Sequence, residues 1–405
     1  MKKLLPLLFC AQLAVAPEVY AQWHSVSSGT SEAMYGGAFA DSATVYLSGW
    51  GSDGASVFKS TDRGETWSAS WHDDGQFFIF GVTFPDPQSG FVAGYDPGCN
   101  CALILQTNDS GNSWNGVTFS SLFGFYKLVK PDASTMLACG YNGAIIRTTN
   151  SGKNWAATQT GNDTLVYRIM NFGDANTGYA VGGATFQLMD KFYKTTDGGA
   201  TWSVQKDYNG ARSVGDLFFF DAMTGLYAGS DGTDCVYKTT NGGTSWMRVY
   251  SGNDKSVFTG IAFANKMKGF AVNEAGRLIK TTDGGDHWTS DYDNTAISLN
   301  VVVANANGRA VAAALDGSVY TNGAASSVRM MNSQPTNIAI DGNKILHVTS
   351  DITSLRIFDL LGREVLRSEL NNSDEYSLAS LASGTYIWSG YRYNTEVSHG
   401  KVLLE

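Results

Sequence analysis

The sequence predicts an all-β protein, in which a seven-bladed β-propeller is followed by a small Ig-like β-sandwich. Three observations lead to this fold class. A short motif recurs with a period in the forties, Gly and aromatic residues are abundant (46 Gly and 12% aromatic in 405 residues), and the period stops before the C-terminus. Such a mixture suits many short strands joined by tight turns. It excludes a disordered chain and a coiled coil.

The recurring motif reads Thr-Thr-Asp/Asn-Gly-Gly-x-x-Trp in its fullest form. Six copies occur, at residues 60–67, 107–114, 148–155, 195–202, 239–246 and 281–288, with Trp-to-Trp steps of 47, 41, 47, 44 and 42. A step of this size is the length of a four-stranded propeller blade.

We expect each motif to form the hairpin turn between the third and fourth strands of its blade. The acid or amide is predicted to be a buried acceptor of backbone N–H groups, and Gly supplies positive φ. The Trp should return to the sheet and pack against the neighbouring blade. The residues given this structural role are Asp62, Asp109, Asn150, Asp197, Asn241 and Asp283, with Trp67, Trp114, Trp155, Trp202, Trp246 and Trp288.

A seventh unit, which contains Gly308–Val311 and Ser318–Gly323, lacks the Trp. That residue is found at the other end of the chain, because Trp23 precedes Trp67 by 44 residues, one full period. We therefore expect residues 22–28 to pair with the strand at 318–322. The two ends of the repeat region would then close the ring and leave only short edges.

Four segments are predicted. Residues 1–21 read as a cleaved signal peptide, with Lys2 and Lys3 before a short apolar run; 22–323 form the propeller, 324–336 a polar linker and 337–405 a separate antiparallel module. No later stretch is apolar enough to span a membrane.

The net charge of −9 and the pI of about 5.1 argue against nucleic-acid binding, which needs a basic face.

Four cysteines remain after the signal peptide: Cys99, Cys101, Cys139 and Cys235. In an oxidising compartment they could pair, but four in so long a chain are not a disulfide framework. One local bridge and buried free thiols both remain open. No His stands near Cys99 and Cys101 in sequence, so we predict no metal site, and no motif indicates a cofactor.

The recurring motif matches the Asp box of the bacterial neuraminidase repeat. The whole unit, over about residues 22–323, resembles the photosystem II stability and assembly factor type of propeller. Neuraminidases, xyloglucan hydrolases and sortilin-like receptors carry similar boxes, so the resemblance is specific for the fold and not for an activity.

The C-terminal module resembles the type A sorting domain of the type IX secretion system. Three ordered stretches carry this resemblance: Leu355–Val365, Leu378–Tyr386 and Lys401–Leu403, with Gly362, Arg363, Gly384, Tyr386 and Lys401 as motif residues. The resemblance implies export across the outer membrane of Bacteroidota, with the secretion machinery as partner. An adhesive Ig-like domain is the alternative.

No convergent catalytic set is visible, and we name no catalytic residue. Tyr167-Arg168-Ile169 faintly resembles the arginine motif of neuraminidases but lacks its Pro, and no evident partners accompany it. Geometry places any ligand site on the propeller face opposite the Asp boxes. The candidate ligand-binding residues are Trp71, Asp73, Asp74, Tyr95, Asp96, Tyr141, Arg168, Tyr208 and Arg212.

Two functions follow from these residues. The first is a monomeric, non-catalytic binding or scaffold propeller, secreted or held at the cell surface after passing through the periplasm, with a glycan or protein ligand. The second is a secreted glycoside hydrolase that uses two acids at the propeller mouth.

Overall fold

A computed structural model describes residues 23–322, apart from 76, 121, 159–164, 185–190, 209–211 and 294–296. Beyond them it describes 338–340, 345–348, 354–359, 363–369, 375–378, 381, 384–392 and 395–404. The predicted signal peptide, the predicted linker and Gly362 lie outside the described residues. In the described part of the chain, no helix has the length and apolar character needed to cross a bilayer.

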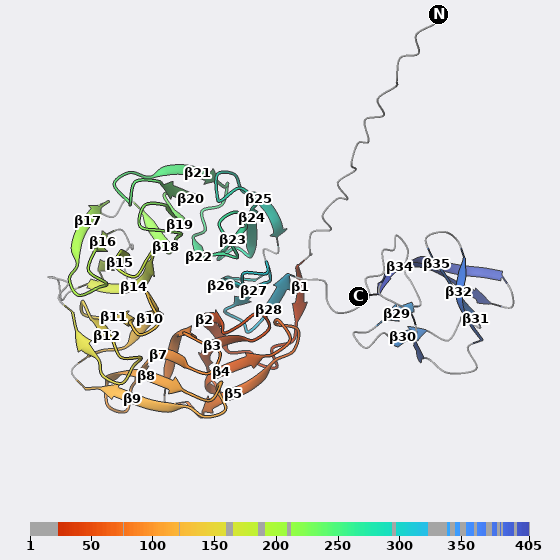
Figure 1. Ribbon diagram of the computed structural model, residues 1–405, viewed down its shortest axis with the longest axis horizontal. Coiled ribbons are helices and arrows are strands. Elements are labelled where there is room, and N and C mark those ends of the chain that lie inside the picture. Colours follow the sequence, from red (N-terminus) through yellow and green to blue (C-terminus); the bar gives the residue numbers. More distant parts are fainter. Residues whose placement is uncertain are drawn as a thin grey trace, which may run out of the picture.

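Seven four-stranded antiparallel sheets follow one another around a ring (Figure 1). Each of the first six runs in chain order from the centre of the ring outwards. Blade 1 comprises β2 (Ala33–Phe39), β3 (Val45–Gly51), β4 (Gly54–Ser60) and β5 (Ser68–Asp73). Blade 2 comprises β6 (Phe78–Thr83), β7 (Gly90–Asp96), β8 (Cys101–Thr107) and β9 (Asn115–Phe119). Blade 3 comprises β10 (Phe125–Val129), β11 (Met136–Gly140), β12 (Ile145–Thr148) and β13 (Ala156–Ala157).

Blades 4 to 7 repeat this order, and the last blade takes its outer strand from the start of the chain. Blade 4 comprises β14 (Leu165–Phe172), β15 (Gly178–Ala184), β16 (Lys191–Thr195) and β17 (Ser203–Asp207), and blade 5 comprises β18 (Ser213–Phe219), β19 (Gly225–Ser230), β20 (Asp234–Thr239) and β21 (Met247–Ser251). Blade 6 comprises β22 (Phe258–Phe263), β23 (Gly269–Asn273), β24 (Arg277–Thr281) and β25 (Thr289–Asp293). Blade 7 comprises β26 (Leu299–Ala304), β27 (Ala310–Ala314), β28 (Val319–Asn322) and β1 (Trp23–Val26).

The ring closes as predicted, because β1 pairs antiparallel with β28 from Trp23 opposite Asn322 to Val26 opposite Val319. Side chains add to this closure. The indole Nε1 of Trp23 donates to Asp291 Oδ2 at 2.9 Å, and the side-chain amide of Asn300 donates to the carbonyl oxygen of Met34 at 2.9 Å. The third strand of the last blade, β28, thereby gains an outer partner, as the third strands of the other six blades have.

The Asp boxes form the turns between the third and fourth strands, and their hydrogen bonds differ in one respect from the prediction. In the fourth box the N–H of Gly199 donates to the buried Thr195 hydroxyl at 2.9 Å, while Asp197 Oδ1 accepts from the Thr201 N–H at 2.9 Å. The Asp197 side chain faces solvent, and its equivalents are exposed or half-buried. The expectation of a buried carboxylate is therefore wrong: the buried acceptor is the Thr or Ser hydroxyl, since the acid must reach outwards to the end of the turn.

The box turns lie beside the turns between the first and second strands. In blade 5 the N–H of Gly242 donates to the carbonyl oxygen of Met223 at 2.8 Å, and in blade 4 the N–H of Gly198 donates to Asn176 at 2.8 Å. These two sets of turns therefore share one face of the ring. The connections between blades and the turns between second and third strands occupy the opposite face.

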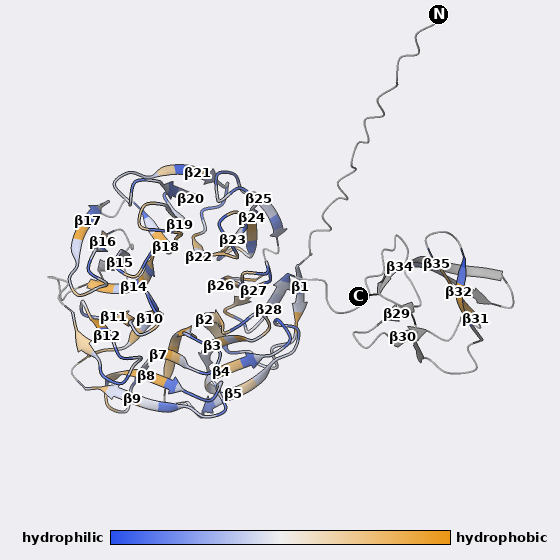
Figure 2. Cartoon of the chain, in the orientation of Figure 1, coloured by the Kyte–Doolittle hydropathy of each residue, from blue (hydrophilic) through white to orange (hydrophobic). Residues whose placement is uncertain are grey.

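Each seam between neighbouring blades holds a cluster of buried side chains that includes one repeat Trp, as expected. Trp202 is 7% exposed and meets Phe172 edge-on at 6.0 Å. Trp23, 4% exposed, occupies the seam between blades 6 and 7, where it meets Phe270 at 5.6 Å. Outer strands such as β5 and β25 are mostly hydrophilic (Figure 2).

The C-terminal segment is all-β, with two antiparallel sheets. One consists of β29 (Ile338–Ile340), β30 (Ile345–Val348) and β33 (Glu375–Ser377); the other consists of β32 (Glu364–Glu369), β31 (Ser354–Phe358), β34 (Gly384–Arg392) and β35 (Thr395–Leu404). The predicted short strands are present, and Leu355, Ile357 and Trp388 are fully buried. That the two sheets form an Ig-like sandwich remains a prediction.

Candidate functional site

Every inner strand of the propeller carries a β-bulge near its start. The pairing with the second strand of the blade shifts by one residue at the same place in all seven blades. The residues in the bulges are Tyr35, Phe80, Gly81, Tyr126, Arg168, Gly215, Thr259 and Asn300. A bulge re-aims a side chain away from the regular alternation of a strand.

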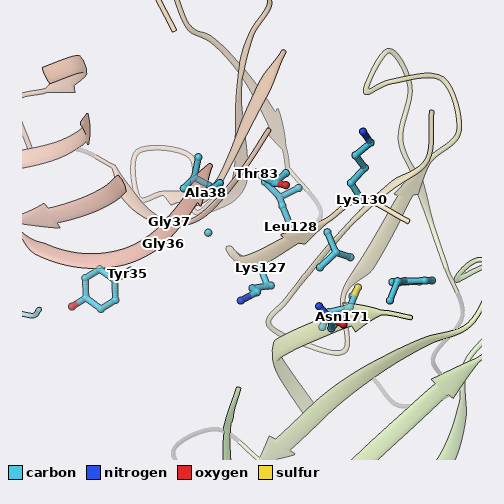
Figure 3. A pocket seen from close by; sticks show the side chains of 14 residues that line it. Tyr35, Gly36, Gly37, Ala38, Thr83, Lys127, Leu128, Lys130 and Asn171 are labelled. Carbon is cyan, nitrogen blue, oxygen red and sulfur yellow. The ribbon is translucent and has the colours of Figure 1, made fainter. Parts of the chain in front are cut away.

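These bulges line one end of the central channel. They surround a pocket of about 410 Å³ on the face opposite the Asp boxes, because each inner strand starts at that face. We call seven of these residues the mouth ring: Tyr35, Phe80, Tyr126, Arg168, Gly215, Thr259 and Asn300. A second pocket, of about 300 Å³, continues along the inner strands towards the box face, where Ala38, Thr83, Lys130 and Asn171 border it (Figure 3).

The mouth ring is asymmetric. Blades 1 to 3 contribute aromatic rings, whereas blades 5 to 7 contribute a glycine, a hydroxyl and an amide. The aromatic side is continuous, since Tyr35 contacts Phe80 at 5.6 Å and Phe80 contacts Tyr126 at 4.6 Å, measured between ring centroids. Trp50 stacks on Tyr35 at 5.5 Å, and Tyr141 contacts Tyr126 at 5.0 Å, so the row extends outwards at both ends.

Arg168 stands at the end of the aromatic side of the ring. Its guanidinium lies 4.9 Å from the centre of the Tyr126 ring, a cation–π arrangement. Burial and a hydrogen bond to the Tyr141 hydroxyl raise the pKa of Tyr126, although the Arg168 charge opposes this shift. Among the described residues no carboxylate pairs with Arg168, and its Nε–H has no acceptor. Within the described part of the chain, the mouth ring therefore has one positive charge that no carboxylate pairs with.

One acid faces the channel beneath Arg168. Asp216, from blade 5, lies 3.5 Å from the Nζ of Lys127, from blade 3, so this ion pair crosses the channel. Asp216 is the only carboxylate among the described residues that border either pocket. Because Lys127 neutralises it, the pair adds no net charge to the mouth.

The structure brings the nine predicted site residues to three separate places. Tyr141 and Arg168 meet on Tyr126 at the channel mouth. Tyr208 and Arg212 lie together above blades 4 and 5, with the guanidinium 4.5 Å from the Tyr208 ring and 4.2 Å from the Tyr237 ring. The third group spreads over blades 1 and 2.

That third group lies at the end of β5 and in the turn between β7 and β8. Trp71 stacks on Phe77 at 6.1 Å, and Asp74 is almost fully exposed beside His72, at 3.1 Å. Asp73 ends β5, and Asp96 caps its own turn by accepting from the Gly98 N–H at 2.7 Å. Tyr95 contacts Phe78, which joins it to Trp50 and hence to the aromatic row.

Sequence reasoning missed Tyr35, Phe80 and Tyr126, the aromatic part of the mouth ring. The sequence did hold an indication of them. When the first strands of the repeats are aligned, Tyr35, Phe80 and Tyr126 fall at the same position as Arg168. The simple alternation of a strand assigns them no common direction, because a bulge breaks the alternation at that point.

A cluster of two acids and one arginine joins blade 6 to blade 5 and to the connection between these blades. Arg277 binds Asp234 at 3.0 Å and Asp254 at 2.7 Å, and the N–H of Asp254 donates to Asp234 at 3.1 Å. Asp234 is fully buried, and burial raises its pKa. These partners indicate a structural role, since both carboxylates are engaged by one guanidinium.

The four described cysteines include both a local disulfide and buried free thiols, the two alternatives that the sequence left open. Cys99 and Cys101 form a disulfide, whereas Cys139 and Cys235 are buried free thiols. Burial raises the pKa of both free thiols to about 12, so they are inert at neutral pH.

The propeller resembles known proteins at two levels. The family described as photosynthesis system II assembly factor YCF48 matches residues 15–166. Among solved structures, YCF48 bound to D1 peptide aligns with a TM-score of 0.60 and 19% identity, covering 75% of this chain and 97% of that one. YCF48 from Cyanidioschyzon merolae aligns with 0.59 and 17%, covering 75% and 99%.

A glycoside hydrolase group has the same fold. The GH74 enzyme of Niastella koreensis aligns with a TM-score of 0.57 and 13% identity, covering 93% of this chain and 73% of that one. No curated protein matches the sequence. At these identities the structures establish the fold alone. The chain is thus a seven-bladed β-propeller, and its residues 15–166 are similar to the family described as photosynthesis system II assembly factor YCF48.

Proposed function

We propose that this protein is an exported, non-catalytic propeller that binds an extended segment of another protein at its channel mouth. The observation that carries the proposal is the asymmetry of the mouth ring. One side is a continuous aromatic surface that ends at Arg168, and the other side is small and polar.

The ring fits a peptide in three respects. Aromatic faces bury apolar side chains, and Arg168 can pair with a carboxylate. The Asn300 amide and the Thr259 hydroxyl donate to Met34 and Leu299, but their side-chain oxygens can still accept from the N–H groups of a peptide. Since no carboxylate of the described residues pairs with Arg168, the ligand is expected to bring an acidic group. Support also comes from the similar propeller YCF48, which has been solved with a D1 peptide.

A glycoside hydrolase is the second candidate, favoured by the similar fold of the GH74 enzymes and by an aromatic row on which sugars could stack. Hydrolysis of a glycosidic bond needs two carboxyl groups at a fixed separation. Of the described residues that border the two pockets, only Asp216 is acidic, and Lys127 neutralises it. The geometry therefore favours binding over hydrolysis.

Export is part of the proposal. The signal peptide predicted at 1–21 would carry the chain to the periplasm, and residues 337–405 would serve as the type IX sorting domain for the outer membrane. In support, the segment has its own antiparallel sheets, and the motif residues Gly384, Tyr386 and Lys401 lie on the paired strands β34 and β35.

Binding to an array of peptides and glycans, followed by calorimetry on the best ligand, tests the function. Arg168→Gln should weaken the binding of an acidic peptide about tenfold or more, because a charged hydrogen bond is lost. Lys266→Gln is the matched control, since Lys266 is an exposed cation on the opposite face, and it should bind as the parent does.

Two outcomes would contradict the proposal. Equal affinity of the parent and Arg168→Gln would remove the mouth ring as the site. Turnover of xyloglucan or sialosides that is lost in Asp216→Asn, with the fold retained, would establish the hydrolase instead.

A further inference from the structure

The turn between β7 and β8 in blade 2 contains the disulfide. Cys99 and Cys101 are separated by Asn100 alone, and their Cα atoms lie 5.3 Å apart. The turn is on the face of the channel mouth, because it joins the second and third strands of its blade. Asn100 has a left-handed backbone, with φ of 54°.

This disulfide is poorly placed to stabilise the fold. A cross-link stabilises a protein mainly by restricting the unfolded chain, and its effect grows with the number of residues that it encloses. Here it encloses one residue. The turn is also closed without it, because Asp96 pairs with Cys101 across the hairpin and the Gly98 N–H donates to Asp96 at 2.7 Å.

The two sulfur-bearing residues differ in accessibility. Cys99 is exposed, whereas Cys101 is fully buried. An incoming thiol can therefore approach only from the side of Cys99. Exposed disulfides with one accessible sulfur are the ones that exchange with other thiols.

We propose that Cys99 and Cys101 form a thiol–disulfide exchange site, which takes a cysteine thiol or dithiol of a partner docked at the channel mouth. The docked partner rests on the proposed function, whereas the exchange chemistry goes beyond it. Because exchange can be measured with a small dithiol and no ligand, failure of the one is distinguishable from failure of the other.

The chemistry balances with a dithiol as the reductant. Its thiolate attacks the Cys99 sulfur, the Cys99–Cys101 bond breaks, and Cys101 leaves as a thiolate that takes a proton from water. The second thiol of the dithiol then attacks the mixed disulfide and releases Cys99. Two electrons pass from the dithiol, which ends as a disulfide, to the protein, which ends with two thiols.

Asp96 modulates this exchange. Its carboxylate lies within 4.8 Å of both sulfur atoms. A negative charge at this distance repels the incoming thiolate and disfavours the thiolate that leaves. The site is thus slowed by its own turn residue and should respond to that charge.

The disulfide is also connected to the aromatic row of the mouth. The Tyr95 hydroxyl donates to the side-chain oxygen of Asn100 at 2.5 Å, and Tyr95 contacts Phe78 at 5.9 Å. Phe78 in turn meets Trp50 at 4.6 Å. Reduction opens the small disulfide-closed loop that contains Asn100. A change in the position of Asn100 should therefore be passed through Tyr95 and Phe78 to the indole of Trp50.

Titration of the folded protein, starting at Gln22 and so without Cys10, with dithiothreitol, followed by alkylation and mass spectrometry, tests the site. We expect alkylation at the exposed Cys99, while Cys139 and Cys235 stay unlabelled until denaturant is added. Tryptophan fluorescence should change along the same titration. Labelling of Cys99 only in denaturant, or of all four cysteines together, would overturn the proposal.

Variants separate the chemistry from the fold. Asp96→Asn keeps the turn acceptor but removes the charge, and it should be reduced about fourfold faster or more, by the Coulomb energy at this distance in water. Asp86→Asn, at a similar turn on the opposite face, is the control and should be reduced at the parent rate. Equal rates for all three proteins would exclude the role of Asp96.

Discussion

The side-chain amine of Lys238 donates to the carbonyl oxygen of Gly284, 2.9 Å away in the Asp-box turn of the next blade. The same contact recurs around the ring: Lys59 donates to Ser110 at 2.7 Å, Arg147 to Gly198 at 2.8 Å and Lys194 to Gly242 at 3.2 Å. The cation immediately before the box of one blade thus contacts the box of the next blade. Since charged donors make the stronger hydrogen bonds, these contacts join the blades on the box face.

Removal of one such contact should loosen the ring. Lys238→Met is expected to lower the free energy of unfolding by about 1.5–3 kcal/mol, because a charged hydrogen bond is lost and the Gly284 carbonyl loses its partner. Urea unfolding measures the change. Lys255→Met, at an exposed lysine on the opposite face, is the control and should be close to neutral. Equal losses for the two variants would show that the contact contributes nothing.

Ring closure by the N-terminal strand should be needed for cooperative melting. A chain that starts at Ala33 lacks β1, which exposes the edge of β28 and empties the seam that Trp23 fills. It should melt at a lower temperature or in several steps, compared with a chain that starts at Gln22. Calorimetry gives both melting curves. Unchanged cooperative melting would reject this closure.

The Asp boxes should make the free energy of unfolding of the propeller depend on pH in the acidic range. Desolvation alone raises the pKa of Asp197, but hydrogen bonds from the Thr201 side chain, the Thr201 N–H and Thr195 outweigh it and lower the pKa to about 2. An unfolded Asp titrates near ~3.9. The stabilisation is therefore complete above about pH 4 and is lost as the pH falls towards about 2.

The variant Asp197→Asn tests this dependence. Asn241 already holds the equivalent place in blade 5 and accepts from the Ser245 N–H at 2.9 Å, so the amide fits the turn. The variant should lose less stability than the parent between pH 5 and pH 2.5, the values chosen for urea unfolding. An equal loss in both proteins would mean that this box does not titrate as described.

The C-terminal segment should serve export and not the function of the propeller. In the native host, truncation before Asn337 should leave a folded propeller in the periplasm, because the sorting signal would be missing. A passive reporter fused to residues 337–405 and supplied with a signal peptide should reach the outside. Cell fractionation and surface proteolysis give the location. Normal delivery of the truncated protein would support the adhesive-domain alternative.

The sequence by itself determined the propeller, because the information for it is local and repeated. A box such as 195–202 specifies its own hairpin through Thr195, Asp197 and Gly199, whatever the rest of the chain does. The period set the number of blades, and Trp23, one period early, set the closure. Both were confirmed by the pairing of β1 with β28.

Only the tertiary structure decided the mouth. Tyr126 and Arg168 are 42 positions apart, and Lys127 and Asp216 are 89 apart; the ring brings each pair together. A sequence pattern records which face of its own strand a residue takes, but not which strands converge on one axis. The bulges that hold Tyr126 and Arg168 recur in every repeat, but the set of side chains that meets at one channel exists only once the ring is closed.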